Sequence, residues 1–252
     1  MMAAGRAASR GLKVLLIEKN KVLGKKLSFT GGGRCNILNA ETDTRTLLSN
    51  YGEAAKFLHS PFAEHGMQDS WDFFHDRDLP LVVEARKRAF PHSQKATDVT
   101  MCMRRYVTDH NVELKLGVKV GRLLTEGKKV FGVETNKGTY FGKNIIIATG
   151  GAARADTGST GDGFSWLCEL GHTVTKPNPN IVPLKVQEPW VHALSGTSLS
   201  FMKITFGTNR DKKQQFSKTG KLLFTHFGLS GPLVLNSAYE VKQLLKAGQV
   251  KA

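Results

Sequence analysis

A glycine-rich, basic segment at residues 24–36 combines residue types that suit ligand binding. Its three consecutive glycines, Gly31, Gly32 and Gly33, carry no Cβ atoms, so backbone N–H groups there can closely approach a planar ring or a phosphate. Arg34 adds positive charge beside them, and Asn36 can both donate and accept hydrogen bonds. We interpret the segment as a ligand-binding loop; the alternative is a flexible linker.

The short apolar run at residues 13–18 ends in an acidic residue, Glu18. A carboxylate at the tip of a strand has two oxygens that can accept hydrogen bonds from the two vicinal hydroxyls of a ribose, as in dinucleotide-binding folds. Many strands also end in a glutamate that only faces solvent. The run therefore predicts either a ribose-binding carboxylate or a solvated strand end.

A second segment rich in glycines and hydroxyls spans residues 157–163. Successive glycines and hydroxyl side chains present many hydrogen-bond donors, which is typical of a phosphate-binding nest. The same residues also suit a tight turn in which Asp162 caps the N-terminus of the following helix. The sequence leaves both interpretations open.

Two side chains are weak candidates for catalysis. His226 can move protons near neutral pH, although a structural role is the more common one for a histidine. Cys35 follows Arg34, which could lower the pKa of its thiol, but the alternative is a small residue that fits a tight loop. The other histidines lack the spacing of metal ligands, so we predict no metal site.

These groups need a scaffold of alternating helices and strands. The N-terminal half predicts a helix, a buried parallel strand, a glycine- and lysine-rich loop, a helical region and then two strands separated by a helix, at residues 1–10, 13–18, 20–40, 43–75, 81–84, 96–110 and 112–115. An antiparallel meander, a fully buried strand and a further helix follow, at residues 118–124, 129–135, 139–141, 144–148 and 163–171.

A proline- and asparagine-rich stretch at residues 176–180 indicates a domain crossing. Short β segments beyond it, around residues 184, 204 and 223, indicate a second, β-rich module. We therefore expect an incomplete first domain at residues 1–178 and an incomplete inserted domain at residues 179–252.

The composition narrows the class of protein. The 252 residues have an ordinary globular apolar and charged content, which excludes disorder, collagen and small disulfide scaffolds. Three cysteines cannot all pair, which favours reduced thiols and a cytoplasmic location, and no segment predicts a leader or a membrane span. The net charge of +15 suggests an anionic partner: a nucleic acid, a membrane surface or a phosphate-bearing cofactor.

Six motifs in this order resemble the BaiN-like, aminoacetone-oxidase-type family of bacterial FAD-dependent oxidoreductases. They are LLIEKN (15–20), GKKLSFTGGGRCN (24–36), RAFPHSQKATDV (88–99), IIIATGGAARADTGSTGDGF (145–164), LGHTVTKPNPNIVPL (170–184) and GKLLFTHFGLSGP (220–232). Together they touch most of the chain. The resemblance implies an α/β fold in which a Rossmann-like FAD-binding domain with a β-meander is interrupted by a β-rich, substrate-side domain.

The resemblance also implies roles for individual residues. Glu18 would hold the adenosine ribose, Val120 would meet the adenine through backbone groups, and Lys19 and Lys26 would line the pyrophosphate and ribityl chain. The glycine loop would pass beside the isoalloxazine through Gly31, Gly32, Gly33, Arg34 and Asn36, and the chain would turn under the cofactor at Thr149, Gly150 and Gly151.

Members of that family begin with a strand and a glycine-rich turn and finish with a returning segment that covers the flavin. This sequence contains neither, so we expect a chain truncated at both ends. The glycine-rich turn supplies backbone amides to the pyrophosphate. We therefore expect residues 1–252 alone to bind FAD weakly or not at all.

The implied activity is that of an enzyme that transfers hydride through flavin N5 to or from an unidentified small organic substrate, with NAD(P)H as donor. Two alternatives stay open. The net charge suggests an RNA-binding protein or a nucleic-acid-associated flavoprotein, although the sequence has no helix-turn-helix, zinc-finger or RNP-like pattern. An inactive truncated fragment is the other.

Overall fold

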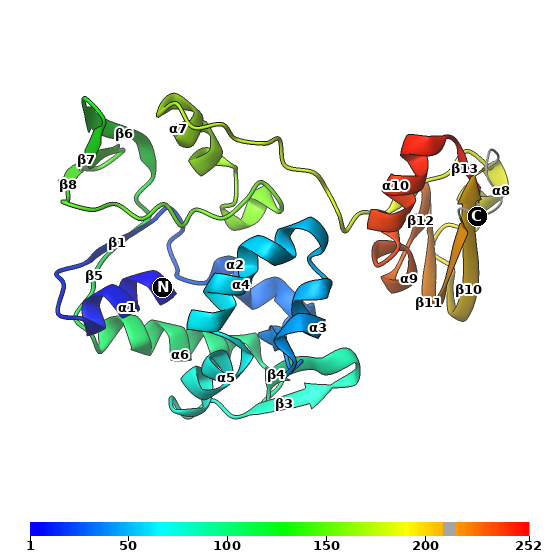
Figure 1. Cartoon of the computed structure of the whole chain (residues 1–252), viewed down its shortest axis with the longest axis horizontal. Helices are drawn as coiled ribbons and strands as arrows, with labels where there is room; N and C mark the ends of the chain where they lie inside the picture. Colours follow the sequence, from blue (N-terminus) through cyan, green and yellow to red (C-terminus); the bar gives the residue numbers. More distant parts are fainter. Residues whose placement is uncertain (209–214, 252) are drawn as a thin grey trace. The chain divides into compact units, whose positions relative to one another are not determined.

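The computed structural model describes residues 1–208 and 215–251. The chain divides into two compact units, unit 1 (Met1–Val174) and unit 2 (Thr175–Ala252), which are described separately below. Figure 1 shows the helices and strands of each. Unit 1 carries every motif of the proposed cofactor site, and unit 2 carries His226.

Unit 1 is an α/β unit. Its α-helices are α1 (Met2–Ser9), α2 (Lys25–Phe29), α3 (Thr44–Ser49), α4 (Ala55–Glu64), α5 (Met67–His75), α6 (Ala96–Thr108) and α7 (Asp162–Glu169). Its strands are β1 (Leu15–Glu18), β2 (Leu38–Asn39), β3 (Leu81–Glu84), β4 (Arg88–Pro91), β5 (Glu113–Leu116), β6 (Val120–Glu126), β7 (Lys129–Thr135) and β8 (Gly138–Phe141). Short 3₁₀ turns lie at Thr30–Gly32, Gly52–Ala54, Ala85–Lys87 and Ala155–Thr157.

These strands form three small sheets. Strands β1 and β5 pair in parallel, with Leu15 opposite Glu113 and Glu18 opposite Leu116. Strands β2, β4 and β3 form an antiparallel sheet in that order, and β6, β7 and β8 form an antiparallel meander. The parallel pair and the meander confirm the expectations from the sequence.

Helix α6 organises the core of unit 1. Its buried residues Val99, Cys102, Met103 and Tyr106 recur at intervals of three or four, so they share one face of the helix. That face packs in a cluster with Cys35 and with residues of α5. Cys35, which lies within the glycine loop, is therefore anchored in the hydrophobic core.

The expected strand at residues 144–148 is wrong. The segment has no strand conformation and pairs with none of the described strands, and Ile146 is 66% exposed. An apolar run becomes a buried strand only where a neighbour satisfies its backbone groups, and β1 pairs with β5 alone among the described strands. For the same reason β1 is half-buried instead of fully buried.

Unit 2 is built on a five-stranded sheet in the order β13-β10-β11-β12-β9. Its elements are β9 (Leu184–Lys185), α8 (Pro189–Ala193), β10 (Ser198–Thr208), β11 (Gln215–Thr225), β12 (Gly228–Ser230), α9 (Pro232–Leu235), α10 (Ala238–Ala247) and β13 (Val250–Lys251). All its strand pairs are antiparallel. The β segments expected around residues 184, 204 and 223 are confirmed.

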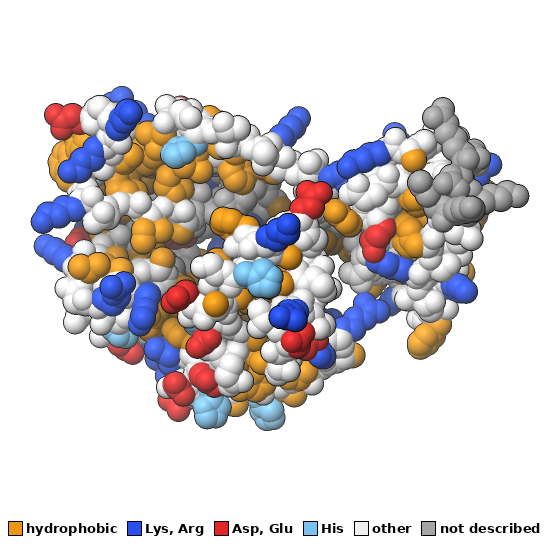
Figure 2. Space-filling view, viewed as in Figure 1, with side chains coloured by type: hydrophobic (Ala, Val, Ile, Leu, Met, Phe, Trp, Pro, Cys, Tyr) orange, Lys and Arg blue, Asp and Glu red, His pale blue; other side chains and the backbone are white. Residues whose placement is uncertain are grey.

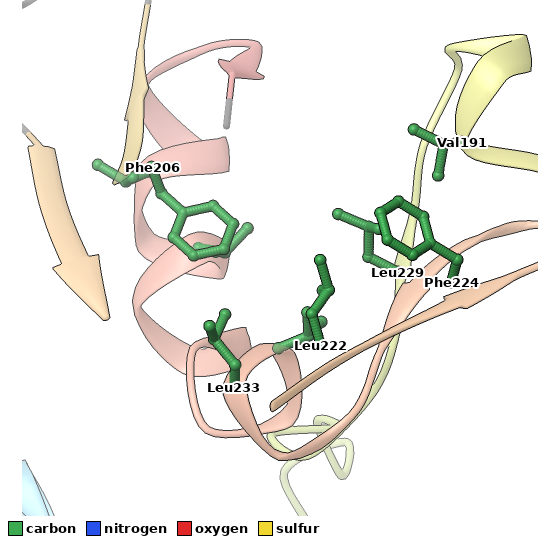
Figure 3. Packing of buried hydrophobic residues seen from close by; sticks show 9 residues of the cluster. Val191, Phe206, Leu222, Phe224, Leu229 and Leu233 are labelled. Carbon is green, nitrogen blue, oxygen red and sulfur yellow. The ribbon is translucent and has the colours of Figure 1, made fainter. Parts of the chain in front are cut away.

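The core of unit 2 lies on one face of this sheet. Phe206, Leu222 and Phe224 point from β10 and β11 toward Leu233 of α9 and Val191 of α8 (Figure 3). Alternate strand residues point to opposite faces, so helices cover one face of the sheet and the remaining residues form the other. This arrangement decides which polar side chains of unit 2 share a surface.

Charged side chains are exposed on both units, and Figure 2 shows Lys and Arg side chains of each on the face in view. No helix among residues 1–208 and 215–251 has the length and apolar content to cross a membrane.

Candidate cofactor site

Glu18 ends β1 at the carboxyl edge of the parallel pair. Its Oε1 atom accepts hydrogen bonds from the backbone N–H of Asn20 at 2.7 Å and from Asn20 Nδ2 at 2.8 Å. Its Oε2 atom accepts no hydrogen bond from a described residue. The carboxylate is therefore held in one orientation with one oxygen available, which is the chemistry that a ribose hydroxyl requires.

The start of the meander lies against the same edge. The N–H of Val118 donates to the carbonyl of Glu18 at 3.1 Å, and the N–H of Gly117 donates to the carbonyl of Asn20 at 2.9 Å. Val120 begins β6 two residues later. The fold thus brings Val120 and Glu18, far apart in sequence, to one end of β1.

Residues 157–162 are bonded to the loop that follows β1. Lys19 Nζ donates to Thr160 Oγ1 at 2.6 Å and to Asp162 Oδ2 at 2.8 Å, and Asn20 Nδ2 donates to the carbonyl of Thr157 at 3.1 Å. The hydrogen bond from Lys19 is the main reason why the pKa of Asp162 lies below its usual value. The positive charge of Lys19 is therefore already partly balanced.

Of the two interpretations of residues 157–163, the one in which Asp162 caps the following helix is wrong. Helix α7 is preceded by Gly161 in the left-handed region, with φ of 81°, and no side chain caps it. The carboxylate of Asp162 instead accepts from Lys19 and from Thr160 Oγ1, the latter at 2.8 Å. These two donors orient the carboxylate, so it does not serve as the cap of its own helix.

Two further lysines reach from α2 to residues 153–156, directly before that segment. Lys25 Nζ donates to the carbonyl of Asp156 at 2.6 Å, and Lys26 Nζ donates to the carbonyl of Ala153 at 2.9 Å. These acceptors are neutral backbone groups, so the bonds position the two ammonium groups without cancelling their charge. Lysines held in this way suit a pyrophosphate.

Thr149, Gly150 and Gly151 lie against the same segment. A Cβ atom at Gly163 would be 2.5 Å from Thr149 Oγ1, and one at Gly150 would be 3.1 Å from Ser159 Oγ. A Cβ at Gly151 would meet no atom within 4 Å, so the backbone there is open to a ligand. The structure therefore joins the 149–151 and 157–163 segments, which the sequence separates.

The glycine loop is closely packed at Gly31 and open at Gly32 and Gly33. Gly31 has φ of 58°, and a Cβ there would be 2.7 Å from the backbone nitrogen of Asn36 and 3.0 Å from Phe90 Cε1. Around Gly32 and Gly33, by contrast, no atom lies within 4 Å of an added Cβ. A flexible linker does not need such close packing, so this geometry favours the ligand loop.

Arg34 fastens the loop to strands β3 and β4. Its Nη1 atom donates to Glu84 Oε1 at 2.8 Å and to Gln94 Oε1 at 3.0 Å, and its guanidinium lies 4.1 Å from the centre of the Phe90 ring. Sequence reasoning about the loop missed these three partners. Two of them, Phe90 and Gln94, belong to the RAFPHSQKATDV motif, which was the available signal.

The catalytic candidates differ in their surroundings. Cys35 is 1% exposed, and burial raises the pKa of its thiol, which disfavours the reactive thiolate. His226 is exposed in the turn between β11 and β12 of unit 2, where its ring packs against Phe227 with 4.9 Å between ring centres. No hydrogen bond joins His226 to another described residue. Neither residue is shown to be catalytic.

The residues fit a dinucleotide such as FAD. Glu18 offers an oriented acceptor, Lys25 and Lys26 offer uncancelled positive charge, and the open backbone at Gly32 and Gly33 offers a surface for a flat ring. Within the described residues, no group of three or more His, Cys, Asp or Glu side chains could hold a metal ion.

Solved structures resemble the chain only loosely. The match with a flavocytochrome c3 fumarate reductase covers 78% of this chain and 44% of the reductase chain, with 16% identity and a TM-score of 0.46. The match with an L-proline dehydrogenase from P. horikoshii covers 97% of this chain and 73% of the dehydrogenase chain, with 14% identity and a TM-score of 0.38. TM-scores this low carry no argument about the family or the function of the chain.

Sequence relatives are more informative. A 3-dehydro-bile acid delta(4,6)-reductase of Clostridium scindens is 27% identical over 99% of this chain and 60% of its own length. Ribosomal RNA dihydrouridine synthases of Haemophilus influenzae and Escherichia coli are 27% and 28% identical over 93% of this chain and 57% and 56% of their own. The chain thus spans less than two thirds of the curated relatives it matches.

The model of one family covers nearly the whole chain. Its description is HI0933-like protein Rossmann domain, and it matches residues 1–248. This confirms both the family resemblance and the Rossmann-type α/β fold expected from the motifs. The chain belongs to the HI0933-like family.

Proposed function

We propose that this chain is the FAD-binding part of an oxidoreductase that transfers hydride between NAD(P)H and an organic substrate. The observation that carries the proposal is Glu18, which is held at the carboxyl edge of β1 by Asn20 with Oε2 available. In open α/β sheets, ligands bind beyond the carboxyl ends of the strands. When bound, FAD would supply the chemistry by accepting and donating hydride at N5.

The residues of the chain would bind and orient this cofactor. We propose that Glu18 accepts from the adenosine ribose, that Val120 meets the adenine, and that Lys19 and Lys26 face the pyrophosphate and ribityl chain. The cation of Lys26 is bonded to a neutral carbonyl and that of Lys19 to Asp162, so Lys26 would contribute more to phosphate binding.

The isoalloxazine would then lie beside the glycine loop. The open backbone at Gly32 and Gly33 supports a close approach by the ring, and Gly31 and Asn36 support the shape of the loop. Arg34 would act as a positioning residue, since its contacts with Glu84 and Phe90 hold the loop in place. Thr149, Gly150 and Gly151 would complete the turn under the cofactor.

We propose that the enzyme reduces its organic substrate. One relative is named a reductase and the others are named for forming a dihydro product, so both names describe the addition of hydrogen. Their substrates, a bile acid and ribosomal RNA, differ in size and charge, so the two names support a type of reaction and not a particular substrate. We propose NAD(P)H as the donor and the cytoplasm, where it is abundant and thiols stay reduced, as the location.

Equilibrium dialysis with FAD up to the millimolar range tests the cofactor proposal, because it also detects weak binding. The E18Q variant removes a charged acceptor of the ribose hydroxyls, so affinity should fall about tenfold. The matched control is E113Q, which removes a glutamate from the opposite edge of the same two-stranded sheet and should bind FAD like the parent chain.

Equal affinity for FAD in E18Q and the parent chain would contradict the role of Glu18. Weak binding, in the millimolar range, is the result that the proposal expects for residues 1–252 alone, and an absence of binding throughout this range would contradict the proposal that these residues bind FAD by themselves. Anaerobic addition of NADH or NADPH to the FAD complex tests the donor separately, since loss of flavin absorbance reports its reduction.

A further inference from the structure

The sheet of unit 2 has a polar face opposite its hydrophobic core. Leu222 and Phe224 of β11 and Phe206 of β10 belong to the core. Their sequence neighbours therefore point away from α9 and α10. We call this surface the outer face; the strand register places on it Lys185, Lys203, Thr205, Ser217, Thr219, Lys221 and Lys251.

The register fixes these positions strand by strand. Lys203 is opposite Thr219, and Thr205 is opposite Ser217 with 2.6 Å between their hydroxyl oxygens. At the two edges of the sheet, Lys251 is opposite Gly207 and Lys185 is opposite Gly228. All four lysines are exposed. With about 4.8 Å between strands, they extend across about 19 Å of the sheet.

Among the residues that the structure describes, no acidic side chain compensates the lysines of the outer face. None of its four lysines forms an ion pair with a described carboxylate. The acidic residues described in unit 2 are Glu188, which precedes α8, and Glu240 of α10. Lys218, on the covered face of β11, is paired with Glu240. Positive charge on the covered face is thus balanced, whereas on the outer face it is not.

An exposed aromatic residue lies beside these lysines. Leu199 pairs with Leu222 and Met202 with Gly220, so Ser200 and Phe201 together face Lys221 in a β-bulge. Phe201 is 89% exposed and has φ of 58°, an unusual conformation for a bulky residue. Bulges often redirect a side chain, and strain of this kind clusters at binding sites.

We propose that the outer face binds single-stranded RNA, with its lysines on the phosphates and Phe201 as a stacking platform for a base. Basic sheets that carry exposed aromatics are a recurrent way to bind single strands. The hydroxyls of Thr205 and Ser217 can bond a ribose 2′-hydroxyl, which favours RNA over DNA. The proposal goes beyond the redox function and does not depend on it.

Fluorescence anisotropy with a labelled oligouridine of about 16 nucleotides tests this proposal on the whole chain. The K203Q/K221Q variant removes two charges from the outer face, and K242Q/K246Q removes two from α10 as the matched control. At 0.1 M salt each lost phosphate contact lowers log K by about 0.7, so K203Q/K221Q should bind about 25-fold more weakly. The control should bind like the parent chain.

The salt dependence provides a second readout. The slope of log K against log salt should be about 1.4 less steep in K203Q/K221Q. The F201A variant should bind at least about fivefold more weakly with an unchanged slope, because stacking releases no counterions. Far-UV circular dichroism of each variant verifies that unit 2 is folded.

Three outcomes would overturn the proposal. Equal losses in K203Q/K221Q and K242Q/K246Q would show a general charge effect. Affinity for the matching DNA, for heparin or for anionic lipid vesicles equal to that for RNA, with F201A unaffected, would identify an unspecific polyanion surface. No RNA binding by the parent chain in low salt would exclude the site, whatever the result of the FAD titration.

Discussion

Two effects can destabilise the glycine loop when a glycine is replaced by alanine: backbone strain and a clash of the new Cβ with neighbouring atoms. Gly31 and Gly32 both have positive φ, 58° and 68°, so alanine at either position suffers backbone strain. Only at Gly31 would the new Cβ also meet other atoms, the backbone nitrogen of Asn36 at 2.7 Å and Phe90 Cε1 at 3.0 Å. Comparison of G31A with G32A therefore isolates the close packing.

The expected magnitudes follow from these contacts. An alanine in the left-handed region costs about 1 to 2 kcal/mol, which should be the whole effect in G32A. Overpacking against a backbone atom adds about 1 to 3 kcal/mol, because Asn36 can move only if the loop moves with it. The free energy of unfolding of unit 1 should therefore fall about 2 kcal/mol further in G31A than in G32A.

Urea unfolding followed by far-UV circular dichroism measures this difference. With a slope of about 2 kcal/mol per molar urea, the midpoint of G31A should lie about 1 M below that of G32A. In an FAD titration, G32A should bind more weakly than the parent chain although it is more stable than G31A, because its methyl group occupies the open side of the loop. Midpoints for the two variants within about 0.2 M of each other would refute the packing argument.

Three further predictions concern the core, the ion pair and the thiols. F206A should destabilise unit 2 by about 3 to 5 kcal/mol, because Phe206 is 1% exposed, whereas F201A should change stability by less than about 0.5 kcal/mol in urea unfolding. Because the pKa of Asp162 is lowered in the fold, its contribution is present above its unfolded pKa and lost as pH falls through the folded value; D162N should therefore be slightly less stable than the parent chain at pH 7, and thermal unfolding should show this gap closing below about pH 4. Ellman's reagent should modify one thiol of the native chain, the exposed Cys168, and the two buried thiols only after unfolding; rapid reaction of all three would contradict the burial.

Local pattern in the sequence determined much of the fold. The helix predicted at residues 96–110 is α6, and alternating runs around two tight turns predicted the meander. Glu18 at the end of its apolar run was identified for the same reason: position within a strand is a property of neighbouring residues. These features depend on contacts between residues close in the chain, so the sequence carries them directly.

Tertiary structure decided what depends on distant partners. The sequence could not show that Lys19 meets Asp162, 143 residues away, or that Arg34 is held by Glu84. It also overestimated residues 144–148, because an apolar run becomes a strand only beside a neighbour that completes its hydrogen bonds.

The positive charge of the chain also shows what the sequence determined and what the tertiary structure decided. The sequence by itself determined a net charge of +15, with positive segments that alternate with neutral or acidic ones. Which lysines share a surface depends on strand register, since a shift of one residue between β10 and β11 would put Lys203 and Lys221 on opposite faces. Only the pairing of β10 with β11 places these lysines together and leaves Lys218 to Glu240 on the other side.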